Sequence, residues 1–416
     1  MAFVLIAVPL LRKMVTEQLA SETSNLFDDS PLSLTGPGGT GKSRIVDAVR
    51  GLATAWFRPN AVMVTALTGI AAATLRGTTI HSSVGLGINQ TRLPKHLQHP
   101  SQEQLEKWDP VLCIIADEMS MADLVLLGLW GQALCHLKEN SKPFGGLIAV
   151  LMFDHCQLLS VRGVPLFKTS SPAKPFSPNQ DYGANLYQAI TKVVYLDESM
   201  RFNDDPEWGF WLAKARLGEW TPEFRAFIQS RADAYNCSSV HDFIQVVSSD
   251  NVTRSATNNM ATKIAAATLV SSRRVYVAPA QLSSDITSLD LIKIRSLPAS
   301  QTGGMPIRIK SNQCFVKGVA NGSTGAPPLN VYVQLPNAPQ SPARFPGLSA
   351  DWPDTVLPLY QTRGSFKYNR RSISMKTYPL VPAFGVTVHG VQGETRERIA
   401  ICNLLPPHLR KVDRHA

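Results

Sequence analysis

The sequence is short of cysteine, of long apolar runs and of acidic residues, and each shortage excludes a class of protein. Its six cysteines are scattered over 416 residues, with no C-x-x-C pair and no histidine at zinc-ligand spacing. This pattern excludes a disulfide-stapled fold or a zinc finger and indicates free thiols in a reducing compartment. The apolar run at residues 3–11 is far shorter than the roughly 18 residues of a membrane-spanning helix, and no basic residue precedes it as in a signal peptide. We expect it to be a buried helix.

The shortage of acidic residues makes the chain basic. Asp and Glu number 31 against 41 Lys and Arg, a formal net charge of +10. The excess is uneven, because residues 361–416 carry ten Lys and Arg against three Asp and Glu. This predicts a polyanion partner that binds mainly to the C-terminal part. A general solubility bias would give the same net charge, so charge alone leaves both interpretations open.

A glycine-rich stretch at residues 36–43, GPGGTGKS, fits the phosphate-binding pattern G-x-x-x-x-G-K-[ST]. An apolar strand is predicted before it at 31–35 and an amphipathic helix after it at 44–56. The backbone N–H groups of such a loop and the positive end of its helix hold a nucleotide polyphosphate. Lys42 would reach the outer phosphates, and the Ser43 hydroxyl would hold Mg²⁺. The predicted ATP-binding residues are Gly36, Gly38, Gly39, Thr40, Gly41, Lys42 and Ser43.

Apolar strands alternate with helices after this loop. The predicted strands are residues 61–65, 111–116 and 147–152. This alternation predicts an α/β fold, a parallel sheet with helices on both faces. In such sheets ligands bind at the carboxyl edge. A polar stretch at 85–110 reads as a small surface insertion.

Adjacent carboxylates follow the predicted strand at 111–116. Asp117 and Glu118 suit the division of labour in phosphoryl transfer, in which one acid binds Mg²⁺ and the other deprotonates the attacking water. Gln157, which follows the predicted strand at 147–152, could sense the γ-phosphate, although a lone glutamine is more often a surface amide. An ordinary solvated acidic turn is the alternative for Asp117 and Glu118.

The length of the chain suits two or three domains. We expect a first domain at 1–170, a linker rich in Pro and Ser at 171–192, and a second α/β domain at 193–416. A Pro-rich β insertion is expected at about 305–380, where prolines restrict any strands to short edges. In the second domain we predict a helix at 208–217 and buried strands at 193–196, 384–388 and 398–403.

An ordered series of blocks resembles the Pif-type (petite integration frequency) DNA helicases, the RecD-like 5′→3′ branch of helicase superfamily one. The blocks are GPGGTGKS, TALTGIAAATLRGTTIHS, IIADEMSM, the pair PFGG and DxxQL, and TVHGVQGET, with further likeness in MR at 200–201, ARLG at 215–218 and GVANGSTG at 318–325. Within this family the chain looks most like the copies carried by rolling-circle transposons. The resemblance runs over residues 2–405.

The resemblance implies two RecA-like motor domains, with ATP and Mg²⁺ between them and single-stranded DNA, or possibly RNA, across their tops. It implies that Gln157 couples to the γ-phosphate and that Arg201 is a finger reaching from the second domain. The residues that match blocks contacting the nucleic-acid backbone are Thr68, Gly69, His81, Thr387 and His389. Gln18, or a glutamine upstream of Met1, would read the adenine. A nuclear or mitochondrial location and roles in DNA repair, recombination and telomere maintenance are further implications.

The chain also departs from the family pattern. Gly390 replaces a lysine in the TVHKxQG block, and Phe202 replaces a glutamine after Arg201. Nothing in residues 404–416 matches the family's final Tyr-Val-Ala-Leu-Ser-Arg block, which carries a second arginine finger. We therefore expect a C-terminally truncated copy. Three functions stay open: an ATP-dependent 5′→3′ DNA helicase or a fragment of one, an impaired remnant that binds ATP and DNA, and a P-loop NTPase that is not a helicase.

Overall fold

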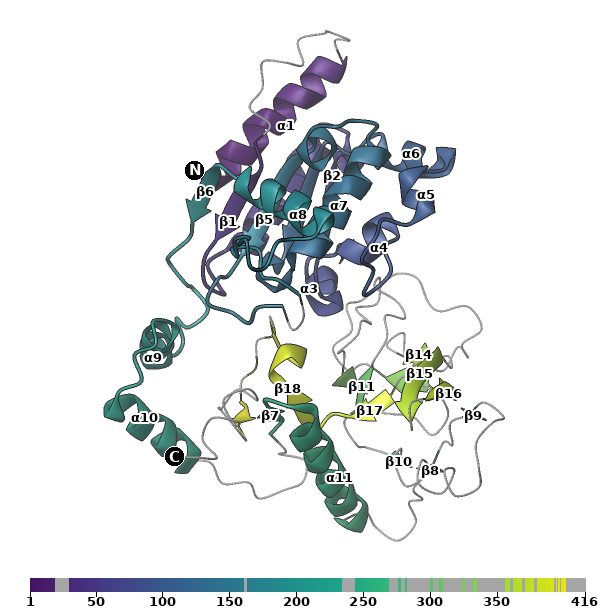
Figure 1. Ribbon diagram of the computed structural model, residues 1–416. Coiled ribbons are helices and arrows are strands. Elements are labelled where there is room, and N and C mark those ends of the chain that lie inside the picture. The colour runs from purple at the N-terminus through teal and green to yellow at the C-terminus, as the bar shows by residue number, and fades with distance from the viewer. Residues whose placement is uncertain are drawn as a thin grey trace. The chain divides into compact units, whose positions relative to one another are not determined.

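The computed structural model divides the chain into two compact units, Met1–Ala232 and Asp233–Ala416, which are considered separately below. It describes residues 1–18, 30–160, 163–233 and 244–268. Beyond these it describes short strands between 276 and 377, residue 359, and residues 380–401 except 393, 395 and 397. No helix in these ranges is long and apolar enough to cross a membrane. Figure 1 shows the helices and strands of both units.

The first unit is built on a six-stranded parallel sheet. Its strands are β1 (Leu32–Thr35), β2 (Val62–Ala66), β3 (Thr78–Thr79), β4 (Cys113–Asp117), β5 (Ile148–Phe153) and β6 (Lys192–Tyr195). Their order in the sheet is β3-β2-β4-β5-β1-β6, and every neighbouring pair is parallel. Strand β5 therefore lies between β1 and β4. The predicted α/β class and parallel sheet are confirmed.

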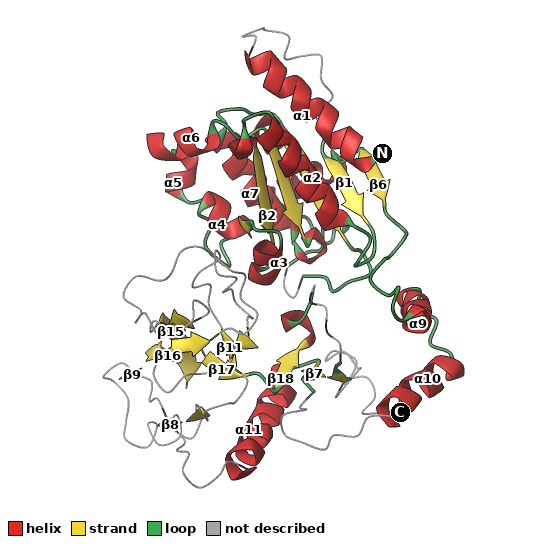
Figure 2. Cartoon of the chain, turned by 180° about the vertical axis from the view of Figure 1, so that it is seen from behind, coloured by secondary structure: helices red, strands yellow, loops and turns green. Residues whose placement is uncertain are grey.

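Each face of the sheet is covered by its own helices. On one face α1 (Ala2–Gln18) and α2 (Lys42–Ala55) lie against the sheet (Figure 2), and their apolar residues are buried there. Successive strand residues point to opposite faces. Cys113 and Ile115 accordingly join the core under α1 and α2, whereas Ile114 joins the core on the other face. The run at residues 3–11 is thus part of a packed helix, as predicted.

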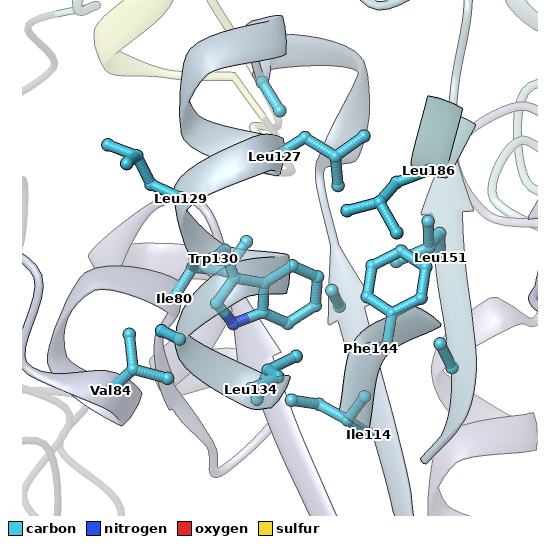
Figure 3. Close-up of a cluster of buried hydrophobic side chains, with 14 of the residues drawn as sticks. Ile80, Val84, Ile114, Leu127, Leu129, Trp130, Leu134, Phe144, Leu151 and Leu186 are labelled. Atoms are coloured by element: carbon cyan, nitrogen blue, oxygen red, sulfur yellow. The ribbon is translucent and has the colours of Figure 1, made fainter. Parts of the chain in front are cut away.

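The second core lies around α7 (Leu124–Leu137). Trp130 of this helix is fully buried and meets Phe144 edge to face, with ring centroids 5.7 Å apart (Figure 3). Such an aromatic pair contributes about 0.5–1.5 kcal/mol beyond the burial of its area. Further helices complete this face of the sheet: α4 (Ile80–Val84), α5 (Lys95–Gln98), α6 (Gln102–Trp108) and α8 (Pro178–Gln188). The short helix α3 (Gly69–Thr74) follows β2, and Leu75 at its C-terminal end joins the core under α1 and α2.

Two segments predicted to be peripheral are instead packed in this unit. The stretch at 85–110 contains α5 and α6, which bury Leu97 and Trp108 in the α7 core. The predicted linker at 171–192 contains α8, which packs on α7. Gly128 and Gly183 allow this approach, because a Cβ on either would overlap the backbone of the other helix. Both segments were predicted to be peripheral because most of their residues are polar, Pro or Ser, although each contains a few apolar side chains that are buried in the core.

The first unit also extends beyond the predicted boundary at residue 170. Strand β6 pairs with β1 at the edge of the first sheet, and Leu196 N–H donates to Thr35 O at 2.8 Å. The unit includes α9 (Pro206–Arg216) and most of α10 (Pro222–Asp233). Aromatic rings join these two helices: the ring centroids of Trp211 and Phe224 lie 5.4 Å apart and nearly parallel.

The second unit contains a small parallel sheet of order β18-β7-β19, formed by β7 (Val246–Ser248), β18 (Gly385–Thr387) and β19 (Ala400–Ile401). Helix α11 (Asn251–Thr268) packs on it through Asn258, whose side chain bonds both the N–H and the C=O of Gly385. The predicted strands at 384–388 and 398–403 correspond to β18 and β19.

Short antiparallel strands fill the region between α11 and β18. They are β8 (Tyr276–Val277), β9 (Gln281–Leu282), β10 (Ser300–Gln301), β11 (Ile307–Ile309), β12 (Thr324–Gly325), β13 (Tyr332–Gln334), β14 (Val356–Pro358), β15 (Thr362–Tyr368), β16 (Arg371–Thr377) and β17 (Leu380–Pro382). Most of the predicted GVANGSTG block and all of residues 402–416 lie outside the described residues.

Candidate nucleotide-binding site

Residues of the first unit's predicted site follow the carboxyl ends of neighbouring strands. The glycine-rich loop follows β1, Asp154 and Gln157 follow β5, and Glu118 follows β4, whose last residue is Asp117. Parallel strands are about 4.8 Å apart, so β1 and β4, with β5 between them, are roughly 10 Å apart. The loop and the two acids therefore lie at the same edge of the sheet, two strand spacings apart.

The loop has the backbone shape that phosphate binding requires. Gly41 is the residue before α2 and adopts a left-handed conformation with φ 86°, which only glycine adopts without strain. Helix α2 begins at Lys42, and the Lys42 Nζ donates hydrogen bonds to Gly36 O at 2.7 Å and Pro37 O at 2.8 Å. The Thr40 hydroxyl donates to Pro37 O at 2.9 Å. The ammonium group is thus held inside the curve of the loop.

Burial lowers the pKa of Lys42, and the nearby carboxylates Asp117, Asp154 and Glu118 oppose that shift. Arg201 lowers it further. An anion such as a phosphate oxygen would offset the desolvation of this ammonium group by giving it a further partner.

The acidic pair after β4 has an unusual backbone. Glu118 lies in the left-handed region with φ 59°, which is uncommon for a residue other than glycine. Its N–H donates to Asp117 Oδ1 at 2.8 Å. Burial raises the pKa of Asp117, and that hydrogen bond and the charge of Lys42 only partly offset it. The turn after β4 thus begins at Glu118, and both acids are half-buried at the end of the strand.

The donor set suits Mg²⁺ that arrives with a nucleotide. Ser43, the second residue of α2, offers a hydroxyl, and Asp117 offers a half-buried carboxylate. Within the described part of the chain, no three His, Cys, Asp or Glu side chains are grouped closely enough to hold a metal by themselves. Mg²⁺ commonly takes one or two protein ligands and completes its shell with phosphate oxygens and water. These residues fit that requirement.

The end of β5 carries a more complete network than the sequence predicted. Asp154 is only 4% exposed, and its carboxylate forms two bonds with Arg216, at 2.8 and 3.1 Å. It also accepts from Gln157 Nε2 at 2.9 Å, while its own N–H donates to Ser120 Oγ at 2.8 Å. Sequence reasoning gave neither Asp154 nor Arg216 a role. Asp154 lies in the DxxQL block and Arg216 in the ARLG block. Their place in these two family-like blocks was the sequence signal that could have identified them.

A segment after β6 crosses the glycine-rich loop. The Ser199 hydroxyl donates to Gly38 O at 2.9 Å, and Met200 N–H donates to Gly39 O at 3.0 Å. The Arg201 guanidinium lies so close to Gly38 that a Cβ there would contact it at 2.7 Å. Arg201 is therefore placed beside the loop as part of the first unit, whereas the sequence analysis expected it to reach from a second domain. The pairing of β6 with β1 causes this difference.

The residues predicted to contact nucleic acid fall into two groups, one in each unit. Thr68 precedes α3 and its hydroxyl accepts from Ala71 N–H at 3.2 Å; Gly69 is the first residue of α3. His81 lies in α4, where burial lowers its pKa and Asp123 opposes the shift. Helix α3 follows β2 and helix α4 follows β3, so both begin at the carboxyl edge of the sheet, where the glycine-rich loop also lies.

In the second unit, Thr387 ends β18 and His389 lies in the following 3-10 turn, Val388–Gly390. Burial lowers the pKa of His389. These two residues thus share a place at the carboxyl end of a parallel strand.

Known proteins resemble this chain in both sequence and structure. Residues 12–207 match the model of the PIF1-like helicase family. A curated relative, the ATP-dependent DNA helicase PIF1 of Saccharomyces cerevisiae, is 34% identical over 205 residues. That match covers 48% of this chain and 22% of the relative, so the chain spans about a fifth of the relative's length.

Solved structures share the fold. The Pif1 helicase of Candida albicans has a TM-score of 0.63 and 19% identity, covering 94% of this chain and 86% of that one. A Pif1 helicase from Bacteroides, solved with ADP-AlF3 and single-stranded DNA, has a TM-score of 0.62 and 19% identity, covering 94% and 85%. At this identity the likeness concerns the fold, which agrees with the parallel sheet described above.

Proposed function

We propose that this chain, whose residues 12–207 match the PIF1-like helicase family, is an ATP-dependent 5′→3′ DNA helicase or the ATP- and DNA-binding part of one. The observation that carries the proposal is the common edge of β1, β5 and β4. It holds the loop of Lys42 and Ser43, the network of Asp154 and Gln157, and the pair Asp117 and Glu118. A Pif1 helicase of similar fold was solved with ADP-AlF3 and single-stranded DNA, which supports the choice of both ligands.

The loop N–H groups and Lys42 would bind the β- and γ-phosphates of ATP, because both present positive charge at the carboxyl end of β1. Mg²⁺, held by Ser43 and Asp117, would supply charge neutralisation at the transferred phosphoryl group. Glu118 would accept the proton of the attacking water, and Gln157 would orient that water or the γ-phosphate.

Arg201 would add positive charge beside the loop. An arginine near the γ-phosphate stabilises charge in the transition state, and where it acts as a finger its contribution is about 10³- to 10⁵-fold in rate. Its closeness to Gly38 supports this role. Because Arg201 belongs to the first unit, its access to the phosphate does not by itself require the second unit.

Single-stranded DNA would bind through Thr68, Gly69 and His81 of the first unit and Thr387 and His389 of the second. Backbone contacts suit a motor that must ignore sequence, and the net charge of +10 favours a polyanion. Such binding weakens with salt, with a log-log slope of about −0.7 for each phosphate contact on a single strand.

The test is ATP hydrolysis by the full chain with Mg²⁺, with and without single-stranded DNA, beside unwinding of duplexes that carry a 5′ or a 3′ tail. The proposal expects hydrolysis that DNA stimulates and unwinding that depends on the 5′ tail. Lys42→Ala should reduce hydrolysis to background, because the outer phosphates lose their cation, while the exposed Lys174→Ala should not. Hydrolysis that persists in a folded Lys42→Ala variant would contradict the site.

An ATP- and DNA-binding remnant remains the second candidate. Gly390 supports it, because this position in the turn Val388–Gly390 carries no side chain where the resembling family has a lysine. The same assays separate the two: a remnant binds nucleotide and DNA with little hydrolysis and no strand separation.

A further inference from the structure

Asp154 occupies the central position of the candidate site. It follows β5, and β5 lies between the strand that precedes the phosphate loop and the strand that ends in Asp117. The carboxylate is almost fully buried and close enough to Lys42 for each to shift the other's pKa. A buried carboxylate at this place would compete for Lys42 or for a metal unless another cation satisfied it.

Arg216 is that cation. It is the last residue of α9, and its two Nη atoms bind the two carboxylate oxygens of Asp154, at 2.8 and 3.1 Å. Burial by itself would raise the pKa of Asp154, but the Arg216 bonds outweigh it and the pKa is lowered. Asp154 is therefore a fixed anion whose charge is already matched.

The fixed carboxylate sets the orientation of Gln157. An ionised carboxylate only accepts hydrogen bonds, so the Gln157 amide must present its Nε2, which donates to Asp154 Oδ2 at 2.9 Å. The amide oxygen then lies on the other side of the group. Gln157 N–H also donates to Asp154 O at 3.0 Å, which closes a short turn.

Helix α9, which carries Arg216, packs on α10 through stacked rings, with Trp208 and Phe227 centroids 5.9 Å apart and Trp211 and Phe224 centroids 5.4 Å apart. Arginine suits this position because its planar fork can hold both carboxylate oxygens at once, which a lysine cannot do.

We propose that Arg216 is a positioning residue for ATP hydrolysis: by clamping Asp154 it holds the Gln157 amide in the orientation needed at the γ-phosphate. This inference rests on the proposed function, because it assigns Gln157 to that reaction. Arg216 itself does not touch the nucleotide. Its removal should therefore slow turnover much more than it weakens nucleotide binding.

The experiment compares Arg216→Ala, Arg216→Lys, Gln157→Ala and the double variant Arg216→Ala/Gln157→Ala in the full chain. Arg216→Ala should lower kcat about 10- to 100-fold, the scale of a misplaced group. KM for ATP and the affinity for a fluorescent ADP should change less than about 3-fold. Arg216→Lys should recover only a small part of kcat, because it restores charge without the two parallel bonds.

The double variant tests the route of the effect. If Arg216 acts through Gln157, adding Arg216→Ala to Gln157→Ala should cause no further loss of kcat. Arg231→Ala is the matched control, since its guanidinium binds Asp205 at 3.1 Å in the same helix pair but both side chains are exposed. It should leave kcat unchanged. Additive losses, or full kcat in folded Arg216→Ala and Arg216→Lys, would overturn the inference.

A second readout does not depend on turnover. Hydrogen exchange of the Gln157 side-chain amide, followed by NMR with ¹⁵N-labelled glutamine, should be slow in the wild type and at least about 10-fold faster in Arg216→Lys, because a carboxylate that is no longer held by two parallel bonds restrains the amide less. Equal exchange in both would overturn the positioning role. A wild type that shows this protection without hydrolysing ATP would instead contradict the proposed function and leave the clamp supported.

Discussion

Strands β4 and β5 lie side by side, and each brings an aspartate to the same edge, yet the two carboxylates have different surroundings. Asp117 is half-buried, and desolvation raises its pKa more than one backbone N–H and the charge of Lys42 lower it. Asp154 is buried, but Arg216 and Gln157 bind it and its pKa is lowered. Side-chain donors thus hold Asp154, whereas a single backbone N–H binds Asp117.

This difference indicates that Asp117 and Asp154 have different roles in the site. An acid that the protein itself satisfies stabilises the fold and positions neighbours, whereas an acid left with an unfavourable charge gains most from an added cation. Asp117 fits the second description and Asp154 the first. Both are aspartates after buried strands, so residue type does not distinguish them.

The largest expected effect comes from the β4 side, at Glu118. Glu118→Gln should lower kcat of ATP hydrolysis by about 10²- to 10⁴-fold, because the general base is lost. Binding of ATP and Mg²⁺ should persist, since Asp117 and the loop are intact. The measurement is single-turnover hydrolysis beside nucleotide affinity. Loss of nucleotide binding would show that the two acids have been given the wrong roles.

Substitution of the two aspartates should change the free energy of unfolding in opposite directions, or in one case not at all. Asp154→Asn should destabilise the first unit by about 2–3 kcal/mol, less than a fully buried pair would lose because the Arg216 side chain is 27% exposed. Asp117→Asn should leave stability unchanged or raise it, because an unfavourable buried charge is removed. Urea unfolding followed by hydrogen exchange at β4 and β5 measures both. Equal losses of stability in the two variants would contradict the different environments assigned to Asp117 and Asp154.

A smaller effect is expected in the pH dependence of the same variants. The lowered pKa of Asp154 means that its stabilisation is present above the ordinary value of 3.8 and is lost as pH falls below it. The raised pKa of Asp117 has the opposite sign, since its ionisation costs stability as pH rises from 3.8 through its higher folded value.

The stability difference between wild type and Asp154→Asn should therefore shrink as pH falls below about 4, while any gain from Asp117→Asn should grow as pH rises above about 4. Unfolding free energies of wild type and both variants across this range give the two curves. Curves of the same sign would contradict the assignment of the two environments.

Local signals in the sequence predicted several features that the structure confirms. The glycine-rich loop lies between β1 and α2, and the strands predicted at 111–116 and 147–152 correspond to β4 and β5 of a parallel sheet, as the alternation of apolar strands and helices indicated. The resemblance to Pif-type helicases is confirmed by the family match over residues 12–207.

Other predictions were wrong because they relied on the overall composition of a segment rather than on its local helix signals. The segment at 171–192 is rich in Pro and Ser and was predicted to be a linker, yet Ser177 and Pro178 begin α8, where Ser177 N–H donates to Gln180 Oε1 at 2.8 Å. Proline at the first helical position and a serine before it are a helix start signal, which the prediction overlooked.

The sequence by itself determined the parts of this site that consist of contiguous residues: the loop at 36–43, the acids 117 and 118 that follow one strand, and the alternation that makes a parallel sheet. Only the tertiary structure decided which strands are neighbours, and hence that Asp154 lies between the loop and the acids. It also decided that Arg216, 62 residues further along the chain, binds Asp154. The physical reason is that local patterns set backbone shape, whereas a buried charge selects its partner from whatever the packed chain brings within reach.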